Sequence, residues 1–585
     1  MSDASRGVHA DLSHLRFPLV ALSFVVVVAC GVRLIGLSET GLGGNDTILY
    51  YSLAERWLQG DYAVSIGPSV EVHRPVLHAM NAAALWLFGH TDWSIKLLNV
   101  VLDTFSLLLI AGLAWQVSRR WSVVLATAVT YGALPIAIWA SRQELAHSAS
   151  IFFVTASSLL LVFGLRRSRQ RSPVALLVLS GAALAAAIGT HEELGFLWLP
   201  MLLFVFAFLL VSSSASSALK ASLAFSVLPL LAGGAIYASQ RDTVQSVLRK
   251  AGSVDSDSGR HPLVSDEFFR FLWDVVLGAG SALLAMLVLL GALVWLYQLI
   301  RRPTGRTVDD MWWWGYCLLV PVAFVGLNSL LFSTIFSRAF LPVFPLLVIF
   351  VYSYLSLVLR PLPFQAAALT LCLFVIAVVL ANMASYSAFA VGNRRYAATW
   401  AEPVWPSIES LQLGYMGFLV DARYRPSYYS HWRSLYRALQ DNVDPGNRVL
   451  ILPSTAMHAP GRRPLQTQVY FGDNAIYRLD HHDLDLATIV SRYNIRWIIF
   501  TTGQQRAVPK WLARYQYNGN WSVPELVDLA EAYRLPEYSV QAEANQLRDF
   551  LSGVGARDVS DFAAGSYEAS ASMIFELRHR RMLSE

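Results

Sequence analysis

Long apolar runs dominate this chain and limit what it can fold into. About eleven runs are long enough, at about 17–25 residues, for a helix to cross a bilayer. They lie near residues 17–37, 95–117, 121–139, 147–165, 173–189, 194–213, 220–238, 273–300, 311–331, 340–359 and 364–386. Of the 585 residues, 55% are hydrophobic and only 15% are charged, so a water-soluble domain could not hide the apolar surface. The sequence predicts an α-helical polytopic membrane protein with about 11 transmembrane helices.

Basic residues between the runs gather on one side of the predicted membrane. They stand in alternate connections, such as those with Arg119 and Lys220, and the positive-inside rule assigns that side to the cytoplasm. The longer segments at 38–94, 239–272 and 387–585 then lie outside. We expect a multi-pass protein of the cell inner (plasma) membrane. Because the basic residues form short clusters beside apolar runs, they indicate membrane lipids as partners and no nucleic acid.

The chain changes character after the last apolar run. Residues 1–386 are expected to form the transmembrane module and residues 387–585 a separate polar region. That region holds strand-like runs at Val449–Leu452 and Trp497–Phe500, and a helix-like segment at 484–493 precedes the second run. This alternation predicts a C-terminal extracytoplasmic α/β domain.

An acid follows the first apolar run. A glycine-rich turn leads to Asp46 at the start of a helix in which Leu49, Leu53 and Trp57 recur at helical spacing. Such an amphipathic helix fits the membrane interface, and an ionisable group beside lipid is a functional candidate. Asn45 or Asp46 could equally act as the cap of this helix, because both residue types cap well.

Four further outer segments carry charged or histidine side chains near the ends of apolar runs. Each has a structural explanation of its own, such as a polar turn before a proline-started helix or an arginine that snorkels to the headgroups. Together they bring acids, histidines and arginines from distant parts of the sequence to one membrane face. Their candidate site residues are His73, Arg74, Arg142, Glu144, His147, His191, Glu192 and Arg338.

One of these segments places His191 beside two acids, Glu192 and Glu193. Unpartnered acids are costly near lipid. Histidine and glutamate both bind metals, so a divalent metal is left open as a cofactor. Because adjacent side chains point in different directions, we favour an ion pair with Arg142 or Arg74.

The interiors of the predicted spans are almost free of charge, and Asp103 and Asn328 are among the few polar exceptions. A transporter places such groups near the bilayer midplane, on broken helices. The sequence therefore predicts a polar site at the outer surface, not a pathway through the membrane.

In order and placement, the motifs resemble those of the membrane-embedded GT-C glycosyltransferases, in the branch of the protein O-mannosyltransferases and the aminoarabinose and galacturonosyl transferases of lipid A. The matching motifs are Gly44–Asp46 with Tyr50–Ala54 and Gly60, His73–Pro75 with Leu87–Gly89, Leu134–Pro135 with Ser141–Arg142, Thr190–Glu192 with Leu199–Pro200, and Ser337–Pro342. The resemblance covers residues 17–386. Where the family often has an acidic pair, this chain has Asn45 and Asp46.

The resemblance implies inverting transfer of a sugar from a polyprenyl-phosphate donor to a protein, lipid or glycan acceptor outside the cytoplasm. Asp46 would be the catalytic base. Binding of the donor phosphate would fall to Arg74, Arg142, Arg338 and His73, and positioning of the sugar to Glu144, His147, His191 and Glu192. The alternatives are a ligase that moves a whole lipid-linked glycan, a transporter or flippase of lipid-linked sugars, and a non-enzymatic assembly protein.

Overall fold

Apolar helices make up most of the structure, which is a computed structural model of the chain. The structure describes residues 4–35, 37, 45–60, 62, 65–66, 70–71, 74–91, 93–143, 146–167, 173–239, 281–301, 306–331, 340–392, 448–452, 474–477, 484–501, 540–554, 557–558 and 572–577. The chain divides into two compact units. The first comprises Met1–Leu37, Leu53–Phe389 and Trp400–Tyr415, and the second comprises Ser38–Ser52, Ala390–Thr399 and Met416–Glu585.

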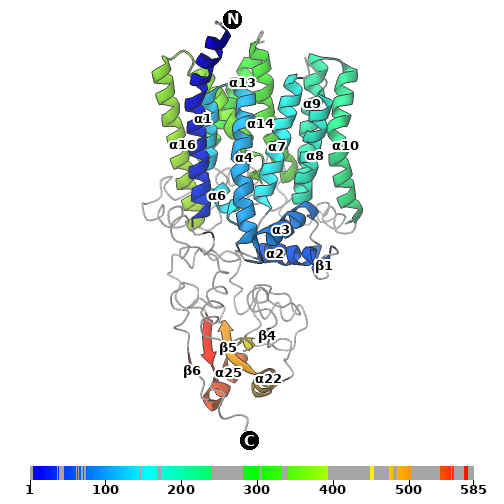
Figure 1. Cartoon of the computed structure of the whole chain (residues 1–585), viewed down its shortest axis with the longest axis vertical. Coiled ribbons are helices and arrows are strands. Elements are labelled where there is room, and N and C mark those ends of the chain that lie inside the picture. Colours follow the sequence, from blue (N-terminus) through cyan, green and yellow to red (C-terminus); the bar gives the residue numbers. More distant parts are fainter. Residues whose placement is uncertain are drawn as a thin grey trace. The chain divides into compact units, whose positions relative to one another are not determined.

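The first unit is a helical bundle (Figure 1). Its long helices are α1 (Ala4–Leu34), α4 (Ser94–Ser118), α7 (His147–Arg167), α9 (Trp198–Ser212), α10 (Ala215–Ser239), α13 (Ala282–Ile300), α14 (Arg306–Leu331) and α16 (Phe364–Gly392). Among the described residues, 8 helical segments, the one at α9 beginning with the 3₁₀ turn before it, are long and apolar enough to cross a membrane. The chain is thus a multi-pass membrane protein.

Three other predicted spans correspond to shorter apolar helices, which are α5 (Trp121–Gly132), α8 (Val174–Thr190) and α15 (Phe344–Val358). The span predicted at 121–139 is not continuous. Helix α5 ends at Gly132, and a separate helix, α6 (Pro135–Ser141), follows. Pro135 explains the break, because proline has no backbone N–H and disfavours helical conformation in the residue before it.

Close helix packing holds the bundle together. Helix α8 packs against α7 and α10, α4 packs against α5 and α7, and α5 also packs against α1 and α15. A Cβ atom on Gly181 of α8 would lie only 2.2 Å from the backbone oxygen of Phe225 in α10. Such small residues let helices approach in a membrane, where packing replaces the hydrophobic effect as the driving force.

Two short helices and a hairpin follow α1. They are α2 (Asn45–Leu58), β1 (Ser65–Ile66), β2 (Val70–Glu71) and α3 (Pro75–Phe88). Helix α3 has proline at its first position, where the fixed φ suits a helix. It lies across the ends of the long helices and packs against α4 and α8 (Figure 1). A short 3₁₀ helix, η2 (Glu192–Leu197), joins α8 to α9 near this end.

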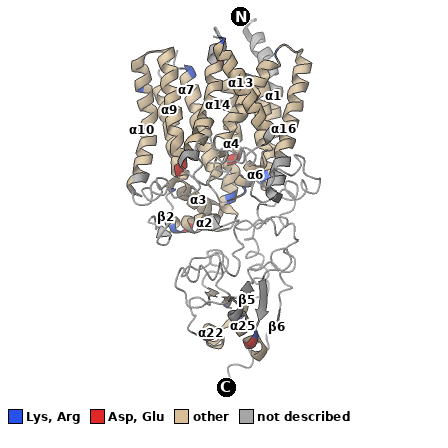
Figure 2. Ribbon diagram, turned by 180° about the vertical axis from the view of Figure 1, so that it is seen from behind, with Lys and Arg blue, Asp and Glu red and all other residues tan. Residues whose placement is uncertain are grey.

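Charged residues are sparse along the helices of the bundle and stand mostly toward the helix ends (Figure 2). The outward surfaces of α1 and α16 are almost entirely apolar, and only 11% of each spanning window is buried inside the protein. Apolar surfaces of this kind suit contact with lipid.

The second unit contains a five-stranded sheet in the order β4-β3-β5-β7-β6. Its elements are β3 (Arg448–Leu452), β4 (Ala475–Tyr477), α22 (Leu486–Tyr493), β5 (Ile495–Thr501), α25 (Val540–Val554), β6 (Arg557–Asp558) and β7 (Ser572–Glu576). Strand β3 is parallel to β4 and β5, while β7 is antiparallel to β5 and β6. Apolar residues of β3, β5, α22 and α25 share one core. The predicted strands at 449–452 and 497–500 are therefore neighbours in one sheet.

Candidate functional site

The structure describes five of the nine predicted site residues with their side chains: Arg74, Arg142, His147, His191 and Glu192. Asp46 is the second residue of α2, but its side chain lies outside the described part of the structure. His73, Glu144 and Arg338 also lie outside it.

Arg74 and Glu192 form an ion pair between two elements that are 118 positions apart in sequence. Arg74 directly precedes α3, and Glu192 opens η2. The arginine Nε donates to Oε2 at 2.9 Å, and Nη2 donates to Oε1 at 3.2 Å. This two-pronged geometry fixes the plane of the guanidinium group. The side chains are 17% and 47% exposed, so solvent weakens the attraction. The pairing favoured from the sequence is present.

His147 and His191 come together from separate connections. His147 begins α7 and is buried, while His191 stands between α8 and η2. Their rings are stacked, with centroids 6.3 Å apart. His191 Nδ1 also lies 3.9 Å from Glu193 Oε2. Two imidazoles and a carboxylate at one helix end form a group that can donate and accept hydrogen bonds.

Arg142 follows α6 and is enclosed by protein, with only 1% of the residue exposed. This rules out snorkelling to the headgroups as the explanation of this arginine. The next residue, Gln143, offers its backbone oxygen to Asn99 Nδ2 of α4 at 2.6 Å. A buried guanidinium at the end of the bundle is well suited to bind a phosphate.

Several polar residues of this region were not singled out from the sequence. Lys96 lies in the first turn of α4 and is fully buried. His78 and Asn81 share one face of α3 and are both buried, and His78 also packs against Trp57 of α2, with ring centroids 5.9 Å apart. The available signal was polarity at the start of otherwise apolar helices. At such positions, polar residues are normally assigned to the headgroup region.

The described residues include no group of three or more histidine, cysteine, aspartate or glutamate side chains arranged to hold a metal ion. Within the α3, α7 and η2 region, Glu192 pairs with Arg74, and His191 lies beside both Glu193 and His147. The side chains of Asp46 and Glu144 are not among those described. The finding on metal ligands therefore does not cover these two acids.

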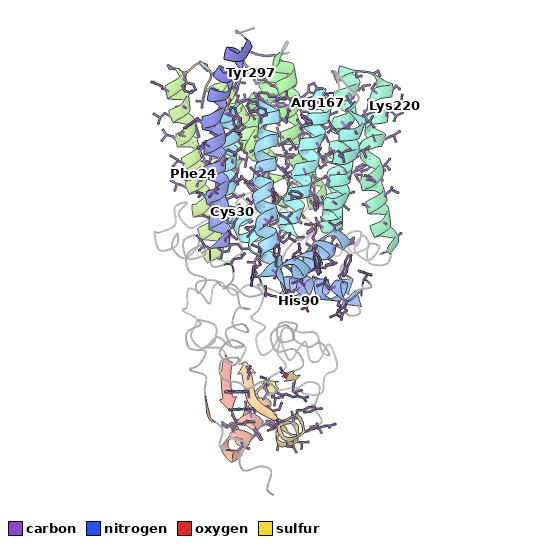
Figure 3. All side chains as sticks on the ribbon, in the orientation of Figure 1. Phe24, Cys30, His90, Arg167, Lys220 and Tyr297 are labelled. Carbon is purple, nitrogen blue, oxygen red and sulfur yellow. The ribbon has the colours of Figure 1, made fainter. Side chains whose placement is uncertain are left out.

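The candidate site residues and the basic connections between helices stand at opposite ends of the bundle. In α7, for example, His147 is the first residue, and Arg166 and Arg167 are the last two. Figure 3 shows Arg167 and Lys220 at one end and His90, two positions after the end of α3 at Phe88, at the other. His90 contacts Glu55 of α2, with Nδ1 3.5 Å from Oε1. The basic connections that the sequence assigns to one side of the membrane therefore do lie at one end of the bundle.

No family model matches the chain, and no curated protein sequence matches it. Solved structures of similar architecture do exist. Oligosaccharyltransferase from Archaeoglobus fulgidus in the apo form matches with 12% identity and a TM-score of 0.45, over 83% of this chain and 70% of that one. ArnT from Cupriavidus metallidurans bound to undecaprenyl phosphate matches with 15% identity and a TM-score of 0.47, over 82% and 92%.

The arabinofuranosyltransferase AftD from Mycobacteria matches with 13% identity and a TM-score of 0.43, over 96% of this chain and 40% of that one. The three proteins carry different names and differ in length. All three matches combine sequence identities of 15% or less with TM-scores below 0.5.

Proposed function

We propose that the chain is an inverting glycosyltransferase of the inner (plasma) membrane that moves a sugar from a polyprenyl-phosphate donor to a protein, lipid or polysaccharide acceptor. One observation carries the proposal. Arginine, histidine and glutamate side chains from the α3, α6–α7 and α8–η2 segments gather at one end of a bundle whose helices are otherwise apolar. Such a group of cationic and hydrogen-bonding side chains beside apolar helices suits a ligand with a charged phosphate and a hydrocarbon tail.

The reaction needs one base and one set of cations. Asp46 takes the proton of the acceptor hydroxyl as that oxygen attacks the anomeric carbon. The bond from this carbon to the phosphate oxygen breaks, and polyprenyl phosphate leaves. Arg74 and Arg142, with Arg338 and His73, stabilise the charge that develops on the departing phosphate. Residues 1–386 form the catalytic module in this proposal, and residues 387–585 an extracytoplasmic domain.

The remaining polar residues would hold the cations and the sugar in place. Glu192 orients the Arg74 guanidinium through its two hydrogen bonds. His147 and His191, with Glu144, would donate and accept hydrogen bonds to sugar hydroxyls. By holding the Arg74 guanidinium in one orientation, the Arg74–Glu192 pair would limit the reorganisation needed at the moment of transfer.

Substitution of Asp46 by asparagine tests the base assignment. Membranes with Asp46→Asn should transfer label from a polyprenyl-phosphate sugar at least about a hundredfold more slowly than wild type, since a positioned base contributes about that much. Glu55→Gln is the matched control, because Glu55 lies in the same helix and pairs with the exposed His90. Near-normal transfer by Asp46→Asn at unchanged protein level would show that the base assignment is wrong.

The same assay separates the alternatives. A ligase would transfer label from a lipid-linked oligosaccharide and not from a single lipid-linked sugar. A flippase in proteoliposomes would change the side on which the labelled donor is accessible without forming a new glycosidic bond.

A further inference from the structure

Polar side chains form a stripe along one face of α4 inside the bundle. Lys96, Asn99, Asp103 and Ser106 recur at intervals of three or four residues, which places them on one side of the helix. Each is 1% exposed or less. Polar residues inside a membrane protein are costly, so those that persist usually have partners and a role.

Asp103 holds the end of α5 and the end of α1 together. One carboxylate oxygen accepts a hydrogen bond from Arg33 Nε of α1. The other accepts one from the Tyr131 hydroxyl of α5 at 2.5 Å. Arg33 Nη1 in turn donates to the backbone oxygen of Gly132 at 3.0 Å. The last two residues of α5 are therefore tied to the buried charges of α1 and α4.

Asn99, also on α4, holds the chain at Gln143, which lies after α6. Its Nδ2 donates to the backbone oxygen of Gln143 at 2.6 Å. Between the two ties lie α6 and, directly before Gln143, the buried Arg142. The stretch 131–143 is thus bonded to α4 at its start and at its end.

We propose that Asn99 and Asp103 are positioning residues for Arg142. The inference rests on the proposed function, in which Arg142 stabilises the departing phosphate. A seven-residue helix and a turn carry the arginine, and displacement of a binding group by about 1 Å can cost about a hundredfold in rate. Anchoring both ends of this segment to one rigid helix keeps the Arg142 backbone in a single place.

Hydrogen exchange of the purified full-length protein tests the anchor without reference to transfer. Asn99→Ala removes the bond to Gln143, and Tyr131→Phe removes one bond to Asp103 while leaving the Arg33–Asp103 pair intact. Ser106→Ala is the control, because its hydroxyl bonds Leu102 within the same helix at 2.8 Å. Amides of 136–143 should exchange about tenfold faster in each test variant and at the wild-type rate in the control. Unchanged exchange in both test variants would overturn the anchoring role.

A double-mutant cycle tests the link to Arg142. Asn99→Ala should lower kcat/KM by about tenfold, equivalent to about 1.4 kcal/mol, when Arg142 is present. In an Arg142→Lys background, which keeps the charge but loses the planar fork, the same change should have much less effect. Equal losses in both backgrounds would overturn the positioning role. If wild-type protein transfers no sugar, the proposed function fails, while the exchange experiment still decides whether the anchor exists.

Discussion

The first turn of α3 rests directly on α8, and substitution of Gly189 by alanine should disturb this contact. A Cβ atom on Gly189 would lie 2.5 Å from Val76 Cγ2 and 3.1 Å from Val76 Cβ. The nearer distance is about 0.9 Å short of the 3.4 Å at which ordinary contact begins. Valine is stiff about its first side-chain torsion, so much of the shift must come from movement of the α3 backbone.

The size of the effect follows from this displacement. Overpacking of this kind costs about 1–3 kcal/mol. Arg74 stands two positions before Val76, and its hydrogen bonds to Glu192 are 2.9 Å and 3.2 Å long. A shift of α3 by about 0.9 Å away from η2 would lengthen both beyond hydrogen-bond range. Under the proposed function, transfer should then slow by one to two orders of magnitude, about the cost of a 1 Å misplacement.

Two measurements check this prediction: thermal unfolding in detergent and sugar transfer from a labelled polyprenyl-phosphate donor. Gly195→Ala is the matched control, because Gly195 lies in η2 and a Cβ atom there would have no neighbour within 4 Å. Val76→Ala combined with Gly189→Ala should restore part of both properties, since it removes the nearer clashing atom. It should not restore them fully, because the Val76 Cβ remains.

The reasoning would be refuted if Gly189→Ala unfolded and reacted like the Gly195→Ala control. It would also fail if Val76→Ala made the Gly189→Ala protein worse, because the clash would then not be the cause. Loss of transfer with unchanged unfolding would locate the damage in the Arg74–Glu192 contact, and loss of stability alone would separate that contact from the reaction.

Two further predictions concern single interactions. In a double-mutant cycle on thermal unfolding, Arg74→Ala and Glu192→Gln should show a coupling of about 1 kcal/mol or less, because the side chains are 17% and 47% exposed; strictly additive effects would show that the pair contributes nothing. In the second unit, the Asp485 carboxylate caps α22 by accepting from the Thr488 N–H at 2.6 Å. Asp485→Ala should weaken this helix by about 1 kcal/mol and speed hydrogen exchange of its amides. Asp485→Asn should leave the exchange unchanged, because asparagine also caps helices. Equal exchange rates in the two variants would contradict the cap.

The sequence located the membrane-crossing elements well because their signal is local. A helix can cross lipid only if about 20 consecutive residues are apolar, so the runs at 95–117 and 147–165 closely match α4 and α7. Pro135 also acts locally, and it divides the apolar run at 121–139 into α5 and α6. The lengths of the runs at 121–139 and 340–359 could not show that α5 and α15 would be shorter than the runs, whereas α8 is as long as its run.

The sequence alone also indicated which kinds of residue gather at one membrane face, because charge asymmetry and loop position are properties of the linear chain. It named Arg74 and Glu192, His147 and His191, and it favoured an ion pair for Glu192. Only the tertiary structure decided which partner Glu192 takes, since Arg142 and Arg74 were equally suitable by type. Arg142 is buried next to Gln143, which bonds to Asn99 of α4, and Arg74 meets the carboxylate.

The stripe on α4 shows most clearly what sequence could not supply. Arg33 and Asp103 are 70 positions apart, and each looks like an isolated polar residue at a different depth of its own helix. Their pairing depends on the packing of α1, α4 and α5, which no local pattern encodes. The linear sequence determines which segments can enter lipid, because each segment must itself be apolar and satisfy its own backbone hydrogen bonds. The tertiary structure decides which polar groups meet, because only packing brings distant segments within hydrogen-bond distance.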